Sequence, residues 1–301
     1  MVAALDGSDI PTRQVDRNLL IATWNLRAFG QVTEKWRSEA GDSPRRDLFD
    51  VRCIAEIVSR FDVVAIQEAR ENLTALRQML TVLGQAWGLI ATDVTRGRAG
   101  NNERLVFVFD SRRVKPSGLA GELVVAIEEE TAVTDAALDR QFARTPYAVS
   151  FTTGSREFTL VTLHVLWGDK EAERVPELRE IATWLADWPN REETWSENLL
   201  TLGDFNVNRG PLYDALTATG LTTPQALNEV PRTIFDSPSE QHFYDQIAWF
   251  EDNGNRSVLT LDFVSAGSFN FVDILKGGLT KTQLSWRISD HFPLWAAFSI
   301  R

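Results

Sequence analysis

Six short polar segments of this chain stand at the ends of apolar, strand-like runs. They carry carboxylates, amides and two of the three histidines: Asn25, Glu68, His164, Asp204 with Asn206, Asp245, and Asp290 with His291. A hard divalent cation takes oxygen ligands, which Glu68, Asp290 and the amide of Asn25 can supply. A water nucleophile needs a carboxylate or an imidazole to accept its proton, and a phosphorane-like oxyanion needs N–H or cationic donors. The set therefore suits the hydrolysis of a phosphoryl ester.

Each of these residues also has an ordinary structural alternative. A carboxylate after a buried strand often caps a helix or lies in a solvated turn, and Asp204-Phe205-Asn206 is compatible with an Asx-type turn. The set as a whole favours chemistry, because two histidines fall beside Asp, Glu and Asn and no second compact polar set competes with them.

The expected elements place these residues at strand ends. Apolar runs predict strands over residues 19–26, 62–67, 105–109, 147–151, 157–166, 199–202, 246–250, 258–264 and 293–300. Helical spacing predicts helices over 45–60, with Ser43 as the N-cap, and over 71–83 and 170–188. Helices between some strands and a hairpin at 152–155 predict mixed sheets with helices on their outer faces. Ligands of open α/β sheets usually bind at the carboxyl ends of strands.

Composition limits what the chain can do. Of its 301 residues 44% are hydrophobic and 24% are charged, which excludes a disordered or fibrous chain. The formal net charge of −11 argues against holding nucleic acid or an anionic membrane through bulk positive charge. The single cysteine, Cys53, excludes a disulfide within the chain. No linker divides the sequence, so we expect one domain over 19–301 after a poorly ordered extension over 1–18.

The sequence contains no run of about 20 apolar residues that would span a bilayer. No apolar signal-peptide core is visible in residues 1–18. We therefore expect a soluble monomer without stable membrane association. It is cytoplasmic by default, and secretion stays open if a leader was removed.

Eight motifs in order carry a resemblance to a known family over about residues 19–299. They are Thr23-Trp24-Asn25-Leu26-Arg27, Ile66-Gln67-Glu68-Ala69-Arg70, Gly97-Arg98 through Glu103-Arg104, Ala143-Arg144-Thr145-Pro146, Leu163-His164, Gly203-Asp204-Phe205-Asn206, Tyr244-Asp245, and Ser289-Asp290-His291-Phe292-Pro293. The chain resembles the endonuclease/exonuclease/phosphatase superfamily and, within it, the deoxyribonuclease I-like nucleases. The resemblance implies a four-layer α/β/β/α sandwich of two mixed sheets with outer helices.

The resemblance also implies a metal site. Glu68, helped by Asn25 and Asp290, would hold a catalytic Mg²⁺ or Mn²⁺, and Ca²⁺ is a further candidate. Asp204 and Asn206 would position the water and the phosphate, with a second metal left open.

Further roles follow from the same resemblance. Asp245 would orient His291, and Glu103 would orient His164, with one imidazole assisting water and the other serving the leaving oxygen. The phosphate-contacting arginines would be Arg144, Arg70 and Arg98. Two of these assignments have structural alternatives: Glu103 as a strand-edge ion pair with Arg104, and the arginines near residue 98 as a solvated basic turn.

The resemblance implies a metal-dependent phosphodiesterase, a DNA endonuclease that leaves a 5′-phosphate. Two departures from the secreted deoxyribonuclease I-like nucleases weaken the case for duplex DNA. Asn208-Arg209 stand where those enzymes have disulfide cysteines, and Asn101 stands where they have a tyrosine that stacks in the DNA groove. One alternative is a phosphoesterase of the same superfamily acting on a phospholipid or a small phosphodiester. Another is a non-catalytic binding module on this fold, which the retained polar set disfavours.

Overall fold

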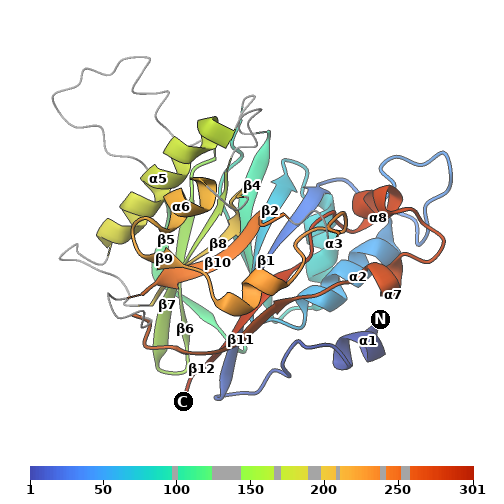
Figure 1. The fold of residues 1–301 in the computed structure, drawn as a ribbon. Coiled ribbons are helices and arrows are strands. Elements are labelled where there is room, and N and C mark those ends of the chain that lie inside the picture. The colour runs from blue at the N-terminus through green and yellow to red at the C-terminus, as the bar shows by residue number, and fades with distance from the viewer. Residues whose placement is uncertain are drawn as a thin grey trace.

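Two six-stranded sheets stacked between helices form the framework of the molecule (Figure 1). The computed structural model describes residues 1–96, 101–123, 144–165, 171–188, 198–207, 211–237, 242–251 and 258–301. The first sheet has the strand order β11-β12-β1-β2-β4-β3 and the second β5-β6-β7-β8-β10-β9. Each contains one parallel pair, β1 with β2 and β7 with β8, among antiparallel neighbours. The expected pair of mixed sheets is confirmed.

The first sheet is built from β1 (Asn18–Phe29), β2 (Val63–Arg70), β3 (Trp87–Ala91), β4 (Glu103–Asp110), β11 (Asp262–Ser268) and β12 (Leu294–Ser299). The second is built from β5 (Lys115–Glu122), β6 (Tyr147–Thr153), β7 (Arg156–His164), β8 (Leu199–Asp204), β9 (Leu221–Thr222) and β10 (Asp245–Phe250). The helices are α1 (Val2–Asp6), α2 (Leu48–Val58), α3 (Thr74–Leu83), α5 (Glu171–Asp187), α6 (Pro211–Thr217), the 3₁₀ helix η2 (Gln225–Glu229), α7 (Val272–Leu275) and α8 (Lys281–Arg287).

Three hydrophobic clusters correspond to the three interfaces of a four-layer sandwich. Strand alternation sends Leu20 and Ala22 of β1 to the side of α2 and α3, whereas Leu19 and Ile21 point into the space between the sheets. The inner cluster joins side chains of both sheets, including Phe107 and Phe151. A third cluster packs the second sheet against α5 and α6, which lie together on its outer side in Figure 1. The predicted α/β/β/α layering is confirmed.

Helix α2 begins later than the sequence pattern predicts. Its N-cap is Asp47, whose side chain accepts from the backbone N–H of Asp50 while the Asp50 side chain accepts from the N–H of Asp47. The expected start at residue 45 with Ser43 as the cap is therefore wrong. A reciprocal capping box satisfies two orphan N–H groups, which a single serine cap four residues earlier could not do here.

The N-terminal segment packs on the domain. Leu5 of α1 is buried in the cluster of the first sheet, and Arg13 forms ion pairs with Asp62 and Asp110. This packing differs from the expected poorly ordered extension over 1–18.

The sequence pattern did not predict three strands of the described chain. The strands β3, β5 and β9 lie at sheet edges, where partial exposure removes the apolar runs that mark buried strands. Strand β11 begins at Asp262, later than the expected 258, and the hairpin of β6 and β7 forms as predicted. Among the described residues, no helix is both long and apolar enough to cross a membrane.

Candidate active site

Three neighbouring strands of the second sheet bring His164, Asp204 and Asp245 into one row. Asp204 of β8 is the register partner of His164 on one side and of Asp245 on the other. Gly203 makes the close approach of β8 to β7 feasible, because a Cβ there would lie 2.0 Å from the carbonyl oxygen of Leu163 and its φ is 146°. The glycine before Asp204 therefore fixes how near the carboxylate comes to His164.

The first sheet contributes Asn25, Glu68 and Glu103 from adjacent strands. Asn25 of β1 is paired with Gln67 of β2, and Glu103 of β4 is paired with Arg70. Glu68 lies where the registers of β2 with both neighbours shift, and its φ is 60°. A bulge with a left-handed residue re-aims the side chain, and strained backbone of this kind is common at functional sites.

Buried hydrogen bonds join β1 to the segment before β12, and β2 to β7 of the second sheet. The Trp24 indole N–H donates to the carbonyl of His291 (2.8 Å), and the Ser289 hydroxyl donates to the carbonyl of Asn25 (2.6 Å). Gln67 donates through Nε2 to Thr162 Oγ1 of β7 at 2.9 Å. These hydrogen bonds therefore fix the positions of the strand ends relative to one another.

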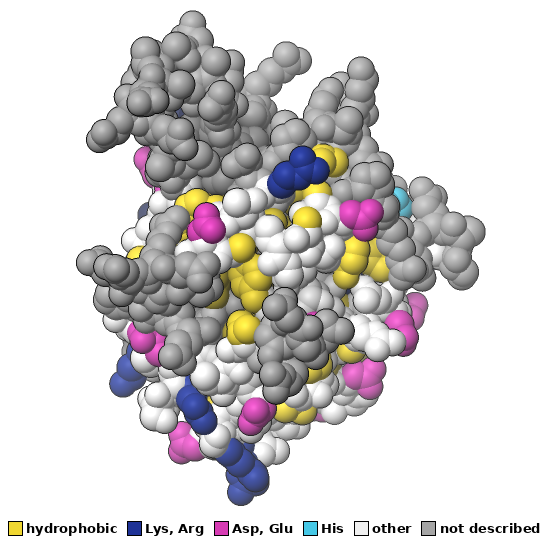
Figure 2. All heavy atoms as spheres, turned by 60° about the vertical axis from the view of Figure 1, so that its left-hand side comes forward, with side chains coloured by type: hydrophobic (Ala, Val, Ile, Leu, Met, Phe, Trp, Pro, Cys, Tyr) yellow, Lys and Arg dark blue, Asp and Glu magenta, His cyan; other side chains and the backbone are white. Residues whose placement is uncertain are grey.

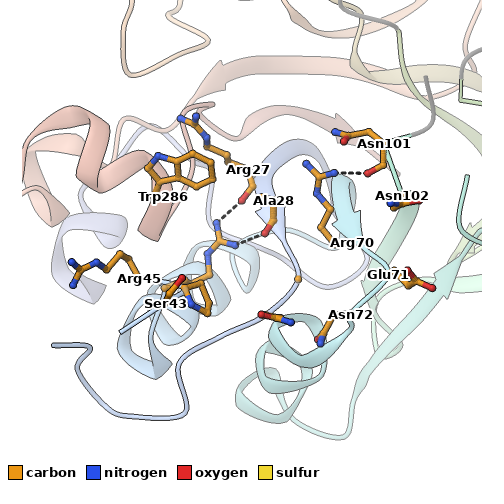
Figure 3. A pocket seen from close by; sticks show the side chains of 14 residues that line it. Arg27, Ala28, Ser43, Arg45, Arg70, Glu71, Asn72, Asn101, Asn102 and Trp286 are labelled. Carbon is orange, nitrogen blue, oxygen red and sulfur yellow. Dashed lines mark hydrogen bonds between the residues drawn. The ribbon is translucent and has the colours of Figure 1, made fainter. Parts of the chain in front are cut away.

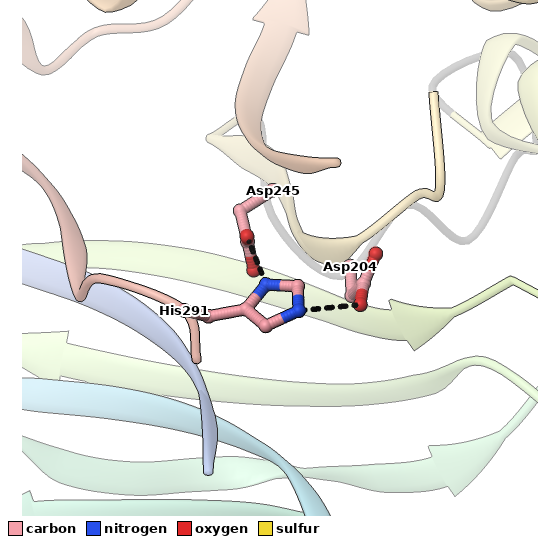
Figure 4. Close-up of side chains that lie close together, drawn as sticks. All are labelled: Asp204, Asp245 and His291. Atoms are coloured by element: carbon pink, nitrogen blue, oxygen red, sulfur yellow. Dashed lines mark hydrogen bonds and ion pairs between the residues drawn. The ribbon is translucent and has the colours of Figure 1, made fainter. Parts of the chain in front are cut away.

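Two imidazoles face the same carboxylate oxygen. His164 contacts Glu103 through Nδ1 (3.0 Å to Oε2), and His291 contacts Asp245 through Nδ1 (2.6 Å to Oδ2). Their Nε2 atoms lie 3.7 and 3.9 Å from Oδ2 of Asp204; Figure 4 shows His291 between the two aspartates. The structure brings together both carboxylate–imidazole pairs expected from the sequence, although their catalytic roles stay predictions.

The Asp245–His291 pair is strongly perturbed by its surroundings. Burial raises the pKa of Asp245 to about 6, although the His291 imidazole works in the opposite direction. Burial would lower the pKa of His291, but the negative charges of Asp245, Asp204 and Asp290 raise it well above the ordinary value. A buried carboxylate in contact with Nδ1 is the arrangement that fixes the orientation of an imidazole.

Asp204 is held by two asparagines at the centre of the site. Its Oδ2 accepts from Asn25 Nδ2 and its Oδ1 accepts from the backbone N–H of Asn206, both at 2.9 Å. The Asn206 amide donates in turn to the carbonyl of Val165. The Asx-type turn considered from the sequence is thus formed, and it orients the carboxylate toward the two imidazoles.

One amide oxygen is left in a position suited to a cation. Within the described part of the chain, Oδ1 of Asn25 is buried without a hydrogen-bond partner, a costly arrangement for a polar atom unless a ligand satisfies it. Carboxylates flank Asn25 along the sheet, Glu68 on β2 and Asp290 just before β12. Oxygen donors on β1, on β2 and just before β12 are of the type that a hard divalent cation takes.

The two carboxylates also have protein contacts. Glu68 accepts from the backbone N–H of Ala28 at 2.8 Å, and Asp290 pairs with Arg27 at 3.1 Å. Burial would raise the pKa of Glu68, but the His164 imidazole, the Ala28 N–H and Arg70 lower it, so the carboxylate stays charged.

A second group could also hold a metal ion. Asp204, Asp245 and His291 each offer one atom within 4.8 Å of the others. Because His291 Nδ1 is already engaged by Asp245, this cluster offers fewer open ligand atoms than the oxygen set around Asn25.

Glu103 joins the site to two predicted phosphate-contacting arginines. Its carboxylate lies 3.4 Å from Arg70 and 2.9 Å from Arg144, whereas Arg104 pairs with Asp93 instead. The alternative of a strand-edge pair between Glu103 and Arg104 is therefore wrong. The third predicted arginine, Arg98, lies outside the described residues.

Sequence reasoning missed several residues that support the site. Arg46 is buried and donates to the carbonyls of Arg27, Ala28, Arg287 and Ile288, so it joins the end of β1 to the segment before Asp290. No sequence signal distinguishes such an arginine from a surface one. Outside this group, His242 contacts Asp236 at 2.8 Å and lies beside the Tyr244 ring.

Comparisons with known proteins agree with this geometry. The chain is 27% identical over 297 residues to a deoxyribonuclease of Thioalkalivibrio sp. (strain K90mix), covering 93% of this chain and 71% of that protein. It is 28% identical over 290 residues to deoxyribonuclease-1 of Canis lupus familiaris, covering 92% and 90%. An endonuclease/exonuclease/phosphatase family protein from Bacteroides thetaiotaomicron has the same fold, with a TM-score of 0.57, 17% identity and coverage of 94% and 95%. No family model matches the chain. Together the fold and the relatives support an assignment to the endonuclease/exonuclease/phosphatase superfamily, with deoxyribonucleases among the proteins that the chain resembles in sequence.

Proposed function

We propose that this chain is a divalent-metal-dependent phosphodiester hydrolase that acts on DNA as an endonuclease and leaves a 5′-phosphate. The observation that carries the proposal is the pair of imidazoles, each held by a buried carboxylate, that face one oxygen of Asp204. Relatives named deoxyribonuclease support a hydrolase acting on phosphoester bonds, and they favour DNA as the substrate.

The chain's own residues divide the work around the scissile phosphate. Asp204, fixed by Asn25 and Asn206, orients the attacking water. His164 and His291 take the two sides of the phosphate, one accepting the proton of the water and the other serving the leaving oxygen. Because Glu103 and Asp245 occupy both Nδ1 atoms, each imidazole presents Nε2 to the substrate.

The metal would be held by Glu68, Asn25 and Asp290. The unpartnered Oδ1 of Asn25 supports this assignment, since a cation would satisfy it. A bound Mg²⁺ or Mn²⁺ would supply charge stabilisation of the phosphoryl oxygens. Arg70 and Arg144, which contact Glu103, are placed to add cationic donors beside the same phosphate.

Nicking of supercoiled plasmid tests the proposal. Wild-type protein is expected to nick in Mg²⁺ or Mn²⁺ and to stop when a chelator is added, and Ca²⁺ alone is run in parallel. His164→Ala and Asp204→Ala should each lower the rate by about 10²–10⁴-fold, the usual contribution of a general acid or base. Melting temperatures close to that of wild type would show that these losses are chemical.

A small chromogenic phosphodiester separates the mechanism from the substrate. Metal-dependent turnover of this ester without plasmid nicking would reject the nuclease and favour a small-molecule phosphoesterase. Equal rates for wild type and both variants would reject the site. Absence of turnover on either substrate would reject the hydrolase.

A further inference from the structure

A hollow of about 890 Å³ opens beside the candidate site (Figure 3). Arg70 belongs to both, because it lines the hollow and contacts Glu68 at 3.2 Å and Glu103 at 3.4 Å. From Arg70 the hollow extends past Arg27 to Arg45 and Trp286. Its volume lies within the ~300–1,000 Å³ range of ligand sites. A ligand there would be in contact with the substrate strand at the active site.

The hollow is rich in arginine, and two of its four arginines pair with carboxylates of the neighbouring site. Four arginines and one carboxylate, Glu71, are among its lining residues, although the whole chain has a net charge of −11. By contrast, the side of the molecule in Figure 2 shows Lys and Arg side chains that lie apart among Asp and Glu. Local concentration of arginines fits an anionic ligand, since guanidinium groups match phosphate geometry.

Two of these arginines are held in place by neighbouring groups. Arg45 donates to the main-chain carbonyls of Glu39 and Ala40, which orient the guanidinium but carry no negative charge. Arg27 donates to the Ser285 hydroxyl at 2.7 Å and pairs with Asp290 at 3.1 Å, so it connects the hollow to the segment before β12. Both are therefore arranged in advance to contact phosphate.

Trp286 adds an aromatic surface to this charge. The indole on α8 is 48% exposed, and the guanidinium carbon of Arg27 lies 3.9 Å from its ring centroid. Figure 3 shows the Arg27 side chain beside the indole at the edge of the hollow. An arginine on an exposed tryptophan next to further arginines is the combination that binds a stacked base and its phosphate.

We propose that this hollow binds an unpaired nucleotide adjacent to the scissile phosphodiester, with the base on Trp286 and the phosphate on Arg27 and Arg45. The inference rests on the proposed function for the neighbouring phosphodiester. Bases in a duplex have both faces covered by their neighbours, so only a single-stranded stretch can place a base on the indole. The preferred substrate is therefore nucleic acid that is single-stranded beside the cleavage point.

Equilibrium binding in chelator tests the subsite without hydrolysis. Anisotropy of a short fluorescein-labelled oligothymidylate is compared with that of a blunt duplex of the same length. Trp286→Ala should weaken oligothymidylate binding about tenfold, since one base–aromatic stack contributes on this scale. Binding of the duplex should change by less than about twofold, and Trp286→Phe should retain most of the affinity because a smaller ring still stacks.

Trp36→Ala is the matched control. Trp36 is another exposed tryptophan, packed on the Phe49 ring, and it does not line the hollow. Its removal should leave the binding of both oligonucleotides unchanged.

The outcomes separate this subsite from the proposed function. Unchanged oligothymidylate binding by Trp286→Ala, an equal loss for duplex, or no binding by wild type would overturn the subsite. Selective loss of oligothymidylate binding in a protein that hydrolyses neither plasmid nor small phosphodiester would reject the hydrolase and keep the subsite. Metal-dependent nicking together with unchanged binding by Trp286→Ala would reject the subsite and keep the hydrolase.

Discussion

Strands β2 and β4 place buried or half-buried carboxylates at both of their ends. At one end lie Asp62, just before β2, and Asp110, the last residue of β4; at the other lie Glu68 and Glu103. The Asp62 and Asp110 carboxylates contact arginines: Arg13 reaches both, Arg113 pairs with Asp62 at 2.9 Å, and Arg112 pairs with Asp110 at 2.7 Å. We call this group the ion cluster.

The candidate site adds imidazoles to such carboxylates. Glu103 contacts His164 as well as arginines, and Asp245 contacts His291. Among the described residues, Asn25 Oδ1 and Asp245 Oδ1 are buried without hydrogen-bond partners. Burial raises the pKa of Asp245 to about 6, whereas hydrogen bonds from Arg112 and Arg13 outweigh burial and lower the pKa of Asp110 to about 2. Carboxylates whose hydrogen bonds are complete stabilise the fold, whereas a carboxylate with an unbonded oxygen is available to a ligand.

Gly203→Ala should have the largest effect, because it disturbs the fold and the site together. The added Cβ would meet the Leu163 carbonyl at 2.0 Å, so β8 must move away from β7 and take Asp204 from His164. We expect loss of hydrolysis comparable to His164→Ala, about 10²–10⁴-fold, together with a lower melting temperature. Gly278→Ala is the control, since nothing lies within 4 Å of a Cβ there. A Gly203→Ala protein with wild-type activity would show that the close approach of β8 to β7 is not needed for hydrolysis.

Asp110→Asn should lower stability and leave the chemistry intact. The substitution weakens charge-assisted hydrogen bonds with Arg13 and Arg112, each typically contributing about 1.5–3 kcal/mol. Because Arg112 is solvent-exposed, we expect a loss of only about 1–3 kcal/mol in urea unfolding. Asp93→Asn, at a pair with Arg104 in which the aspartate is solvent-exposed, should leave the urea midpoint nearly unchanged. A fall in the hydrolysis rate of folded Asp110→Asn would contradict the separation of the stabilising ion cluster from the candidate site.

The ion cluster also predicts how stability depends on pH. The folded pKa of Asp110 is about 2 and its reference value is 3.8, so the unfolded chain binds the proton more readily. The contribution of Asp110 is therefore complete above about pH 4 and is lost as the pH falls toward 2. Urea midpoints between pH 5 and 2.5 should fall more steeply for wild type than for Asp110→Asn. Parallel curves would show that Asp110 is not the group responsible.

The sequence predicted the layers and the clustering of the candidate residues better than the contacts that support them. Strand alternation and the motif order placed Asn25, Glu68 and His164 at strand ends, because buried strands leave a clear apolar pattern. The contacts of Arg46 and the bulge at Glu68 depend on packing between segments far apart in the chain, and no local pattern encodes them. Edge strands were missed for the related reason that exposure hides their periodicity.

His242→Ala should have the smallest effect. The Asp236–His242 pair resembles the two pairs of the site, but the structure places its carboxylate in a turn where it accepts from the backbone N–H groups of Arg232 and Thr233. We expect the hydrolysis rate to change by less than about threefold, the scale of a substitution outside a site. A loss above tenfold would add this third pair to the catalytic group.

The central claim is that the carboxylates of the site act through the imidazoles they hold. A double-mutant cycle for Asp245 and His291, read as the rate of plasmid nicking in Mg²⁺, tests it most directly. We predict that Asp245→Asn lowers the rate at least about tenfold in wild type and has almost no effect when His291 is already alanine. Equal effects of Asp245→Asn in both backgrounds would contradict the account.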